Sequence, residues 1–134
     1  MTNCILDFIF YIFFMTEEEM KTRTKKFAVR TFKFIQNMQP INGSRNIGWQ
    51  LIDCSSSVAA NYRAVCMGKS RRDFVHKLRI VLEEADESAF WLEFIKELSI
   101  HKDEQELKVL HQEATELTKI FIASIKTAER NVIK

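Results

Sequence analysis

The stretch that decides the fold is residues 70–95, SRRDFVHKLRIVLEEADESAFWLEFI. Apolar or small side chains recur in it at alternating steps of four and three, which is typical of one face of a packed α-helix. This stripe consists of Phe74, Leu78, Val81, Ala85, Ser88, Leu92 and Ile95. Ser70 and Asp73 have the spacing of a capping box, in which side chains bond exposed amide groups. The stretch therefore predicts a helix that begins after Ser70, with Phe90, Trp91 and Phe94 widening its apolar face.

Three further segments show the same helical period. They are residues 24–38, 46–66 and, after a break at 99–102, 107–128. Pro40 and Gly43 suit the end of the first segment, and Gly68 suits the end of the second. An all-β domain is nearly ruled out, because its many turns would need more than three Gly and one Pro in 134 residues. Short connections join the last three segments, so consecutive helices should lie antiparallel, and the sequence predicts an all-α bundle of four helices.

The first fifteen residues, MTNCILDFIFYIFFM, form an apolar run that contains Asp7. The run is shorter than the roughly 20 residues that span a bilayer, and it lacks the positive start and cleavage site of a signal peptide. We therefore expect residues 1–20 to be an extension outside a domain of residues 21–134, with translation starting at Met15 or Met20. A short membrane or partner anchor is the alternative, and we otherwise expect no membrane contact.

The usual patterns of catalytic and metal-binding residues are incomplete. Only Asp73 and His76 have the spacing of one half of a di-iron motif, and the three Gly are isolated, so there is no phosphate-binding loop. Cys54 falls on a helical apolar stripe among small residues, which favours an inert buried thiol over a nucleophile. Three Cys without a C-x-x-C pair indicate a reducing, cytoplasmic setting. We predict no enzyme, catalytic residue, metal or cofactor.

The net charge of +2 is the sum of segregated charges. Residues 21–45 carry seven basic residues and no acid, residues 63–79 carry six with Asp73 alone, and residues 83–106 carry nine acids against two Lys. These charged residues could lie on solvated faces and pair between helices. Alternatively, the basic face of one copy of the chain could contact the acidic face of a neighbouring copy in an oligomer. They could also form a basic surface that binds the backbone of RNA or DNA. The candidate contacts are then Arg63, Lys69, Arg71, Arg72, Lys77 and Arg79, followed by Lys25, Lys26, Arg30 and Lys33.

Asn61 is the polar residue that falls on the apolar stripe of the segment 46–66. A buried amide without a partner costs about 1–3 kcal/mol, so we expect its side chain to bond another side chain or a helix carbonyl. The structural interpretation is a polar core residue that fixes the packing register, as Asn does in coiled coils. A ligand contact at a pore or groove is the alternative.

Several motifs in order resemble one protein family. They are residues 50–64 (QLIDCSSSVAANYRA), 70–78 (SRRDFVHKL), 80–88 (IVLEEADES) and 90–92 (FWL). They are similar to the bacterial four-helix-bundle protein family, also called the 23S ribosomal RNA intervening-sequence protein family, over roughly residues 24–128. The resemblance implies an up-down four-helix bundle that assembles as a ring-shaped homopentamer. It also implies distant kinship with accessory proteins of diversity-generating retroelements, which bind reverse transcriptase and nucleic acid.

The charge map and the resemblance together lead to two expectations. The first is a non-enzymatic, oligomeric helical module that binds nucleic acid through its basic residues. The alternative is a protein–protein scaffold or accessory subunit, for example to a reverse transcriptase, whose charged faces are used in subunit contacts. The partners expected are therefore further copies of the chain, RNA or DNA, and a partner protein.

Overall fold

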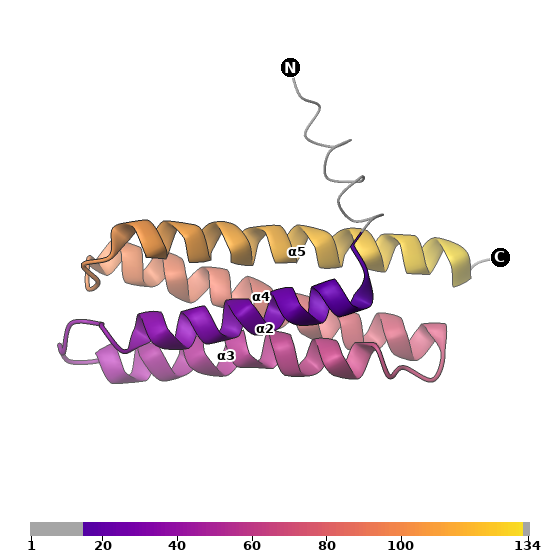
Figure 1. The fold of residues 1–134 in the computed structure, drawn as a ribbon, viewed down its shortest axis with the longest axis horizontal. Coiled ribbons are helices and arrows are strands. Elements are labelled where there is room, and N and C mark those ends of the chain that lie inside the picture. The colour runs from indigo at the N-terminus through magenta and orange to yellow at the C-terminus, as the bar shows by residue number, and fades with distance from the viewer. Residues whose placement is uncertain (1–14, 133–134) are drawn as a thin grey trace, which may run out of the picture.

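The computed structural model describes residues 15–132, and in that range the chain forms four α-helices and no strand. The helices are α2 (Glu17–Ile35), α3 (Ser44–Val65), α4 (Arg71–Leu98) and α5 (Glu104–Val132). Figure 1 shows them side by side in one long bundle, with the chain reversing direction at each connection. The predicted all-α four-helix bundle is confirmed. Among the described residues, no helix is both long and apolar enough to cross a membrane.

The start of α2 lies seven residues before the position expected from its apolar period. The Thr16 hydroxyl accepts a hydrogen bond from the Glu19 amide at 3.1 Å, and the Glu19 carboxylate accepts one from the Thr16 amide at 3.1 Å. This reciprocal cap fixes the start, which the apolar period alone does not reveal. Met20 is buried, so the helical core includes this last residue of the proposed extension. The rest of the proposed extension, residues 1–14, lies outside the described residues.

The start of α4 was predicted correctly. The Ser70 hydroxyl accepts a hydrogen bond from the Asp73 amide at 3.1 Å. The Asp73 carboxylate accepts from the Lys69 amide at 3.2 Å, one residue earlier than in a standard capping box. Two short polar interactions thus position the first turn of α4, and with it the basic residues that flank Ser70.

The core consists mainly of the predicted stripes. In α4 the stripe from Leu78 to Ile95 is buried, while Phe74 packs against the core and is partly exposed. In α3 the prediction for Asn61 is wrong, because Asn61 is partly exposed and Tyr62 is buried in its place. After Val58, the next buried residues of α3 are therefore Tyr62, four residues on, and Val65, three residues after that. An apolar ring at this position avoids the cost of burying an amide.

A buried histidine ties the connection between α4 and α5 to the end of α2. The ring of His101 stacks on Phe34, with centroids 3.7 Å apart and planes 12° apart. His101 Nε2 lies 2.8 Å from the Phe34 carbonyl oxygen, and the Asp103 amide donates to Nδ1 at 3.0 Å. The ring therefore carries its proton on Nε2, with both nitrogens bonded to backbone groups. Its role is structural, which scattered histidines in the sequence do not reveal.

Candidate nucleic-acid interface

Three of the ten basic candidates are neutralised by acidic partners. Arg30 holds Glu106 through two hydrogen bonds of 2.9 Å. Lys77 pairs with Asp73 at 3.1 Å, one turn away on α4, and Arg79 pairs with Glu129 across the bundle. A cation with a carboxylate partner must exchange that partner for a phosphate, so these three side chains are weaker candidates for nucleic-acid contact.

Four of the candidates surround the connection between α3 and α4. Arg63 is in the last turn of α3, Lys69 lies in the connection, and Arg71 and Arg72 open α4. All four side chains are exposed, and within the described part of the chain none forms an ion pair. We call these four residues the basic turn.

The basic turn places positively charged side chains at the N-terminus of α4, the end of a helix that carries a partial positive charge. The N-terminus of a helix carries a partial positive charge and normally favours acidic side chains in the first turn. In α4 the first turn has Arg71 and Arg72 beside a single acid, Asp73. The carboxylate of Asp73 is already bonded to Lys77 and to the Lys69 amide, which lowers its pKa below the ordinary value. An anion near this turn would therefore meet a net positive field.

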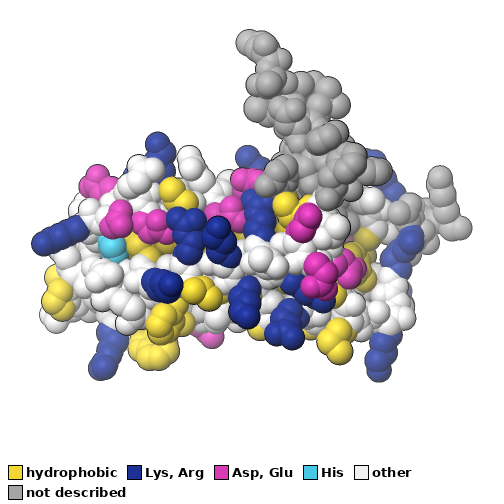
Figure 2. Space-filling model, viewed as in Figure 1, with side chains coloured by type: hydrophobic (Ala, Val, Ile, Leu, Met, Phe, Trp, Pro, Cys, Tyr) yellow, Lys and Arg dark blue, Asp and Glu magenta, His cyan; other side chains and the backbone are white. Residues whose placement is uncertain are grey.

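The second set of candidates lies on α2. Lys25, Lys26 and Lys33 are exposed and form no ion pair with a described residue. Figure 2 shows Lys and Arg side chains spread over this side of the bundle, with Asp and Glu side chains among them. The structure thus separates the ten candidates into the basic turn, the α2 lysines and the three paired residues, and does not bring them into one patch.

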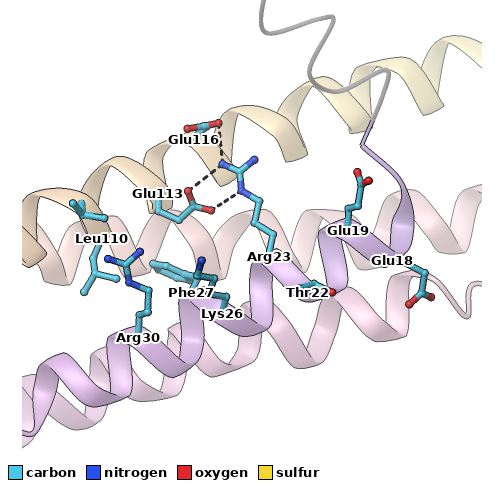
Figure 3. Close-up of a pocket in the computed structure, with 11 residues that line it drawn as sticks. Glu18, Glu19, Thr22, Arg23, Lys26, Phe27, Arg30, Leu110, Glu113 and Glu116 are labelled. Atoms are coloured by element: carbon cyan, nitrogen blue, oxygen red, sulfur yellow. Dashed lines mark hydrogen bonds and ion pairs between the residues drawn. The ribbon is translucent and has the colours of Figure 1, made fainter.

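Paired charges line the groove between α2 and α5. The groove has a volume of about 630 Å³, and Figure 3 shows Arg23 reaching across it to Glu113 and Glu116. Arg23 lies 2.6 Å from Glu113 and 2.8 Å from Glu116. Burial opposes the charge of Arg23, but the hydrogen bonds to both glutamates outweigh burial and hold its pKa above the ordinary value. The groove is thus a seam between two helices, sealed by ion pairs.

Cys54, His76 and His111 are not arranged as a catalytic or metal-binding site among the described residues. Cys54 is 1% exposed, so the predicted burial of this thiol is confirmed, and burial raises its pKa to about 11. His76 is exposed, as expected, and His111 lies 2.8 Å from Glu93. In the part of the chain that the structure describes, no three His, Cys, Asp or Glu side chains are grouped so that they could hold a metal ion.

Of the three rings that the sequence placed beside the core, Trp91 and Phe94 pack against it, whereas Phe90 is on the outside of α4. Phe90 is 50% exposed, and Trp91 and Phe94 are partly exposed. Their rings contact one another, with centroids 5.0 to 6.0 Å apart. The helical period shows that these side chains flank the core stripe, but it does not show whether another helix covers them.

Comparison with known proteins identifies the family. The 23S rRNA-intervening sequence protein family matches residues 16–123, which contain α2, α3, α4 and most of α5. The chain belongs to this family. A crystal structure of a protein of unknown function from the S23 ribosomal protein family of Bacteroides thetaiotaomicron has a similar fold, with a TM-score of 0.67. It is 29% identical in sequence, and the similarity covers 82% of this chain and 97% of that one.

No curated protein matches the sequence. The 23S rRNA-intervening sequence protein match includes the whole basic turn and begins at Thr16, the residue that caps α2. The predicted family is therefore confirmed, and the helical domain extends to the N-terminal side of residue 21. The similar crystal structure is of a protein of unknown function, so this similarity assigns no role to individual residues of the chain.

Proposed function

We propose that this 23S rRNA-intervening sequence protein is a non-enzymatic helical module that binds the backbone of RNA or DNA through the basic turn. The observation that supports it is a group of four exposed cations, Arg63, Lys69, Arg71 and Arg72, without a described acidic partner. Phosphate groups of a nucleic acid would supply the negatively charged partners that these four side chains lack among the described residues. The α2 lysines extend the positive surface as weaker contacts.

The chemistry of the basic turn favours recognition without sequence preference. Arg and Lys bind phosphate oxygens, which position a protein on nucleic acid but carry no base information. Base-specific binding of single strands usually needs aromatic side chains among the basic ones. Among the described residues, the exposed Phe and Trp rings are those of Phe32, Trp49 and Phe90, and none of them belongs to the basic turn. The proposed interface therefore recognises the charge of the nucleic-acid backbone and not the base sequence.

A salt titration tests the proposal. Each phosphate contact lowers the slope of log K against log salt by about 0.9, so four contacts predict about a 100-fold loss of affinity between about 50 and 200 mM salt. Replacing the four residues of the basic turn by Gln should weaken binding of duplex DNA or RNA and flatten the salt dependence. Fluorescence anisotropy with labelled oligonucleotides of two unrelated sequences measures both effects.

A matched variant separates local contact from overall charge. Lys96, Lys102, Lys108 and Lys119 are exposed and lie away from the basic turn, so their replacement by Gln removes the same net charge. The control should retain most of the affinity. Equal weakening by the two variants, or no binding by the native chain at low salt, would contradict the proposal.

The scaffold or accessory-subunit function is supported by a different observation. Phe90 is exposed and contacts the partly buried rings of Trp91 and Phe94, and aromatic side chains are enriched in protein interfaces. A stable protein complex that forms equally well with the native chain and the basic-turn variant would favour this function over nucleic-acid binding.

A further inference from the structure

Two exposed cations near the end of α5 lie outside the ten basic candidates. They are Lys126 and Arg130, and neither forms an ion pair with a described residue. The two residues are one helical turn apart, so their side chains share one side of α5. Glu129 is the one acid in residues 117–132, the last turns of this helix. We call Lys126 and Arg130 the α5 cations.

An ion pair between α4 and α5 places the α5 cations close to the basic turn. Arg79 of α4 pairs with Glu129, which lies three residues after Lys126 and immediately before Arg130. Arg72 precedes Arg79 by seven residues, two helical turns, so it lies on the same side of α4. Figure 1 shows the connection between α3 and α4 and the C-terminal end of α5 at the same end of the bundle. The basic turn and the α5 cations therefore lie on either side of the α4–α5 seam at this end.

The acids along this part of the seam are already neutralised. Asp73 is the one acid in residues 69–82, and it pairs with Lys77. Glu129 is likewise held by Arg79. The charges that remain unpaired on both sides of the seam are therefore positive, and a polyanion that lies across the seam meets cations on two helices.

The first turn of α2 limits this positive surface on its other side. It carries three acids, and it begins at the same end of the bundle as the basic turn. Burial and then the nearby charge of Glu17 raise the pKa of Cys66, the residue that follows α3, so these acids lie beside the end of α3. Because α4 packs against α3 and α5, the acids of α2 are on the far side of α3 from the seam. A polyanion is therefore repelled from α2 and attracted to the α4–α5 seam.

We propose that a nucleic-acid duplex lies across the α4–α5 seam, with the phosphates of one strand on the basic turn and those of the other strand on the α5 cations. This inference rests on the proposed function and names the duplex as its ligand. The axes of packed helices are about 8–10 Å apart, and the grooves that separate the two backbones of B-DNA are about 6–12 Å wide. Cations on two neighbouring helices are thus spaced to reach both strands. A duplex also carries one negative charge per about 1.7 Å of its length, twice that of one strand.

The side chains around the seam do not favour a single strand. Proteins that bind single strands stack the bases on aromatic rings between the cations. Among the described residues, the exposed Phe and Trp rings are those of Phe32, Trp49 and Phe90, and none lies in residues 63–79 or 117–132. The surface at the seam therefore offers contacts to phosphates and no ring on which an unpaired base could stack.

The experiment measures binding of the full chain to DNA and RNA duplexes and to their separate strands, by fluorescence anisotropy at several salt concentrations. Lys126→Gln with Arg130→Gln should weaken binding of a duplex by about tenfold or more at about 0.1 M salt. It should also reduce the slope of log K against log salt by about 1.8, the value for two phosphate contacts. Lys102→Gln with Lys108→Gln removes the same charge at the opposite end of the bundle and should leave both quantities unchanged.

A cation in the last turn also stabilises the negative end of a helix, so circular dichroism checks that each variant is folded. Lys126→Gln alone repeats the test outside the last turn, where Arg130 lies. The duplex type, DNA or RNA, that loses more affinity is the one that the surface fits better.

The outcomes separate this inference from the proposed function. A native chain that binds no nucleic acid would overturn both. If the native chain binds and loses affinity when the basic turn is replaced, but the folded α5 variant binds like its control, only the duplex inference is overturned. Tighter binding of separate strands than of either duplex would also overturn it.

Discussion

At the scale of single residues, two buried threonines of α2 differ in how their hydroxyl groups are satisfied. Thr24 and Thr31 are both fully buried. The Thr24 hydroxyl lies 2.9 Å from the carbonyl oxygen of Met20 and donates to it. Among the described residues, Thr31 has the one buried side-chain oxygen that lacks a hydrogen-bond partner. Two identical side chains seven residues apart therefore contribute differently to stability.

We predict that Thr31→Val raises the free energy of unfolding by about 1 kcal/mol. The substitution keeps the shape of the side chain and removes a hydroxyl whose burial without a partner is unfavourable. Urea denaturation followed by circular dichroism measures the change. Thr24→Val is the matched control and should be neutral or destabilising, since it removes a bonded hydroxyl. A Thr31→Val protein less stable than the Thr24→Val protein would contradict this explanation.

At the scale of the elements, backbone conformation at the connections decides where helices end. Two described residues have a positive φ, Gly43 at 91° before α3 and Ser99 at 54° after α4. Glycine adopts this left-handed region without steric cost, whereas a side chain costs about 1–2 kcal/mol there. The chain thus has the favoured residue, glycine, at position 43, and an unfavoured residue, serine, at position 99.

We predict that Ser99→Gly stabilises the protein by about 0.5–1 kcal/mol, because glycine is the usual residue at a left-handed helix end. Gly43→Ala should have the opposite sign, since it places a side chain at a φ of 91°. Thermal melts of the two variants and the native chain measure both changes. A fall in melting temperature for Ser99→Gly would show that its side chain has a role beyond the turn.

At the scale of the whole molecule, α2 is held unequally by its two neighbours. It packs closely on α3 and has far fewer contacts with α5. Ion pairs bridge the weaker seam, formed by Arg23 with Glu113 and by Arg30 with Glu106. Arg23 is the more buried of the two arginines, so its pair is screened less by water. The closure of the bundle therefore depends on long-range electrostatic contacts.

We predict that Arg23→Gln lowers the free energy of unfolding by about 2 kcal/mol, because it leaves Glu113 and Glu116 without their cation. The amides of α2 should then exchange with solvent faster than those of α3 and α4. Arg79→Gln breaks a more exposed pair and should cost less than about 1 kcal/mol. Urea denaturation and hydrogen exchange compare the two variants, and a larger effect of Arg79→Gln would contradict the proposed importance of the seam.

The sequence by itself determined the four-helix bundle, the start of α4 immediately after Ser70 and the burial of Cys54. These features depend on residues within a few helical turns of one another, so period, capping and the scarcity of Gly and Pro are sufficient to predict them. The start of α2 was missed because its cap lies outside the apolar period. The ten basic candidates were also named from the sequence, but the sequence did not predict which of them lie together or which have an acidic partner.

Only the tertiary structure decided which of those candidates remain unpaired. Arg30 meets Glu106, 76 residues away, and no local pattern predicts that contact. The same is true of Tyr62, which takes the core position expected for Asn61, and of Phe90, which faces outward. The physical reason is that burial and ion pairing depend on how helices distant in sequence pack together. Helical period sets which residues share a face, and the neighbouring helices set what that face contacts.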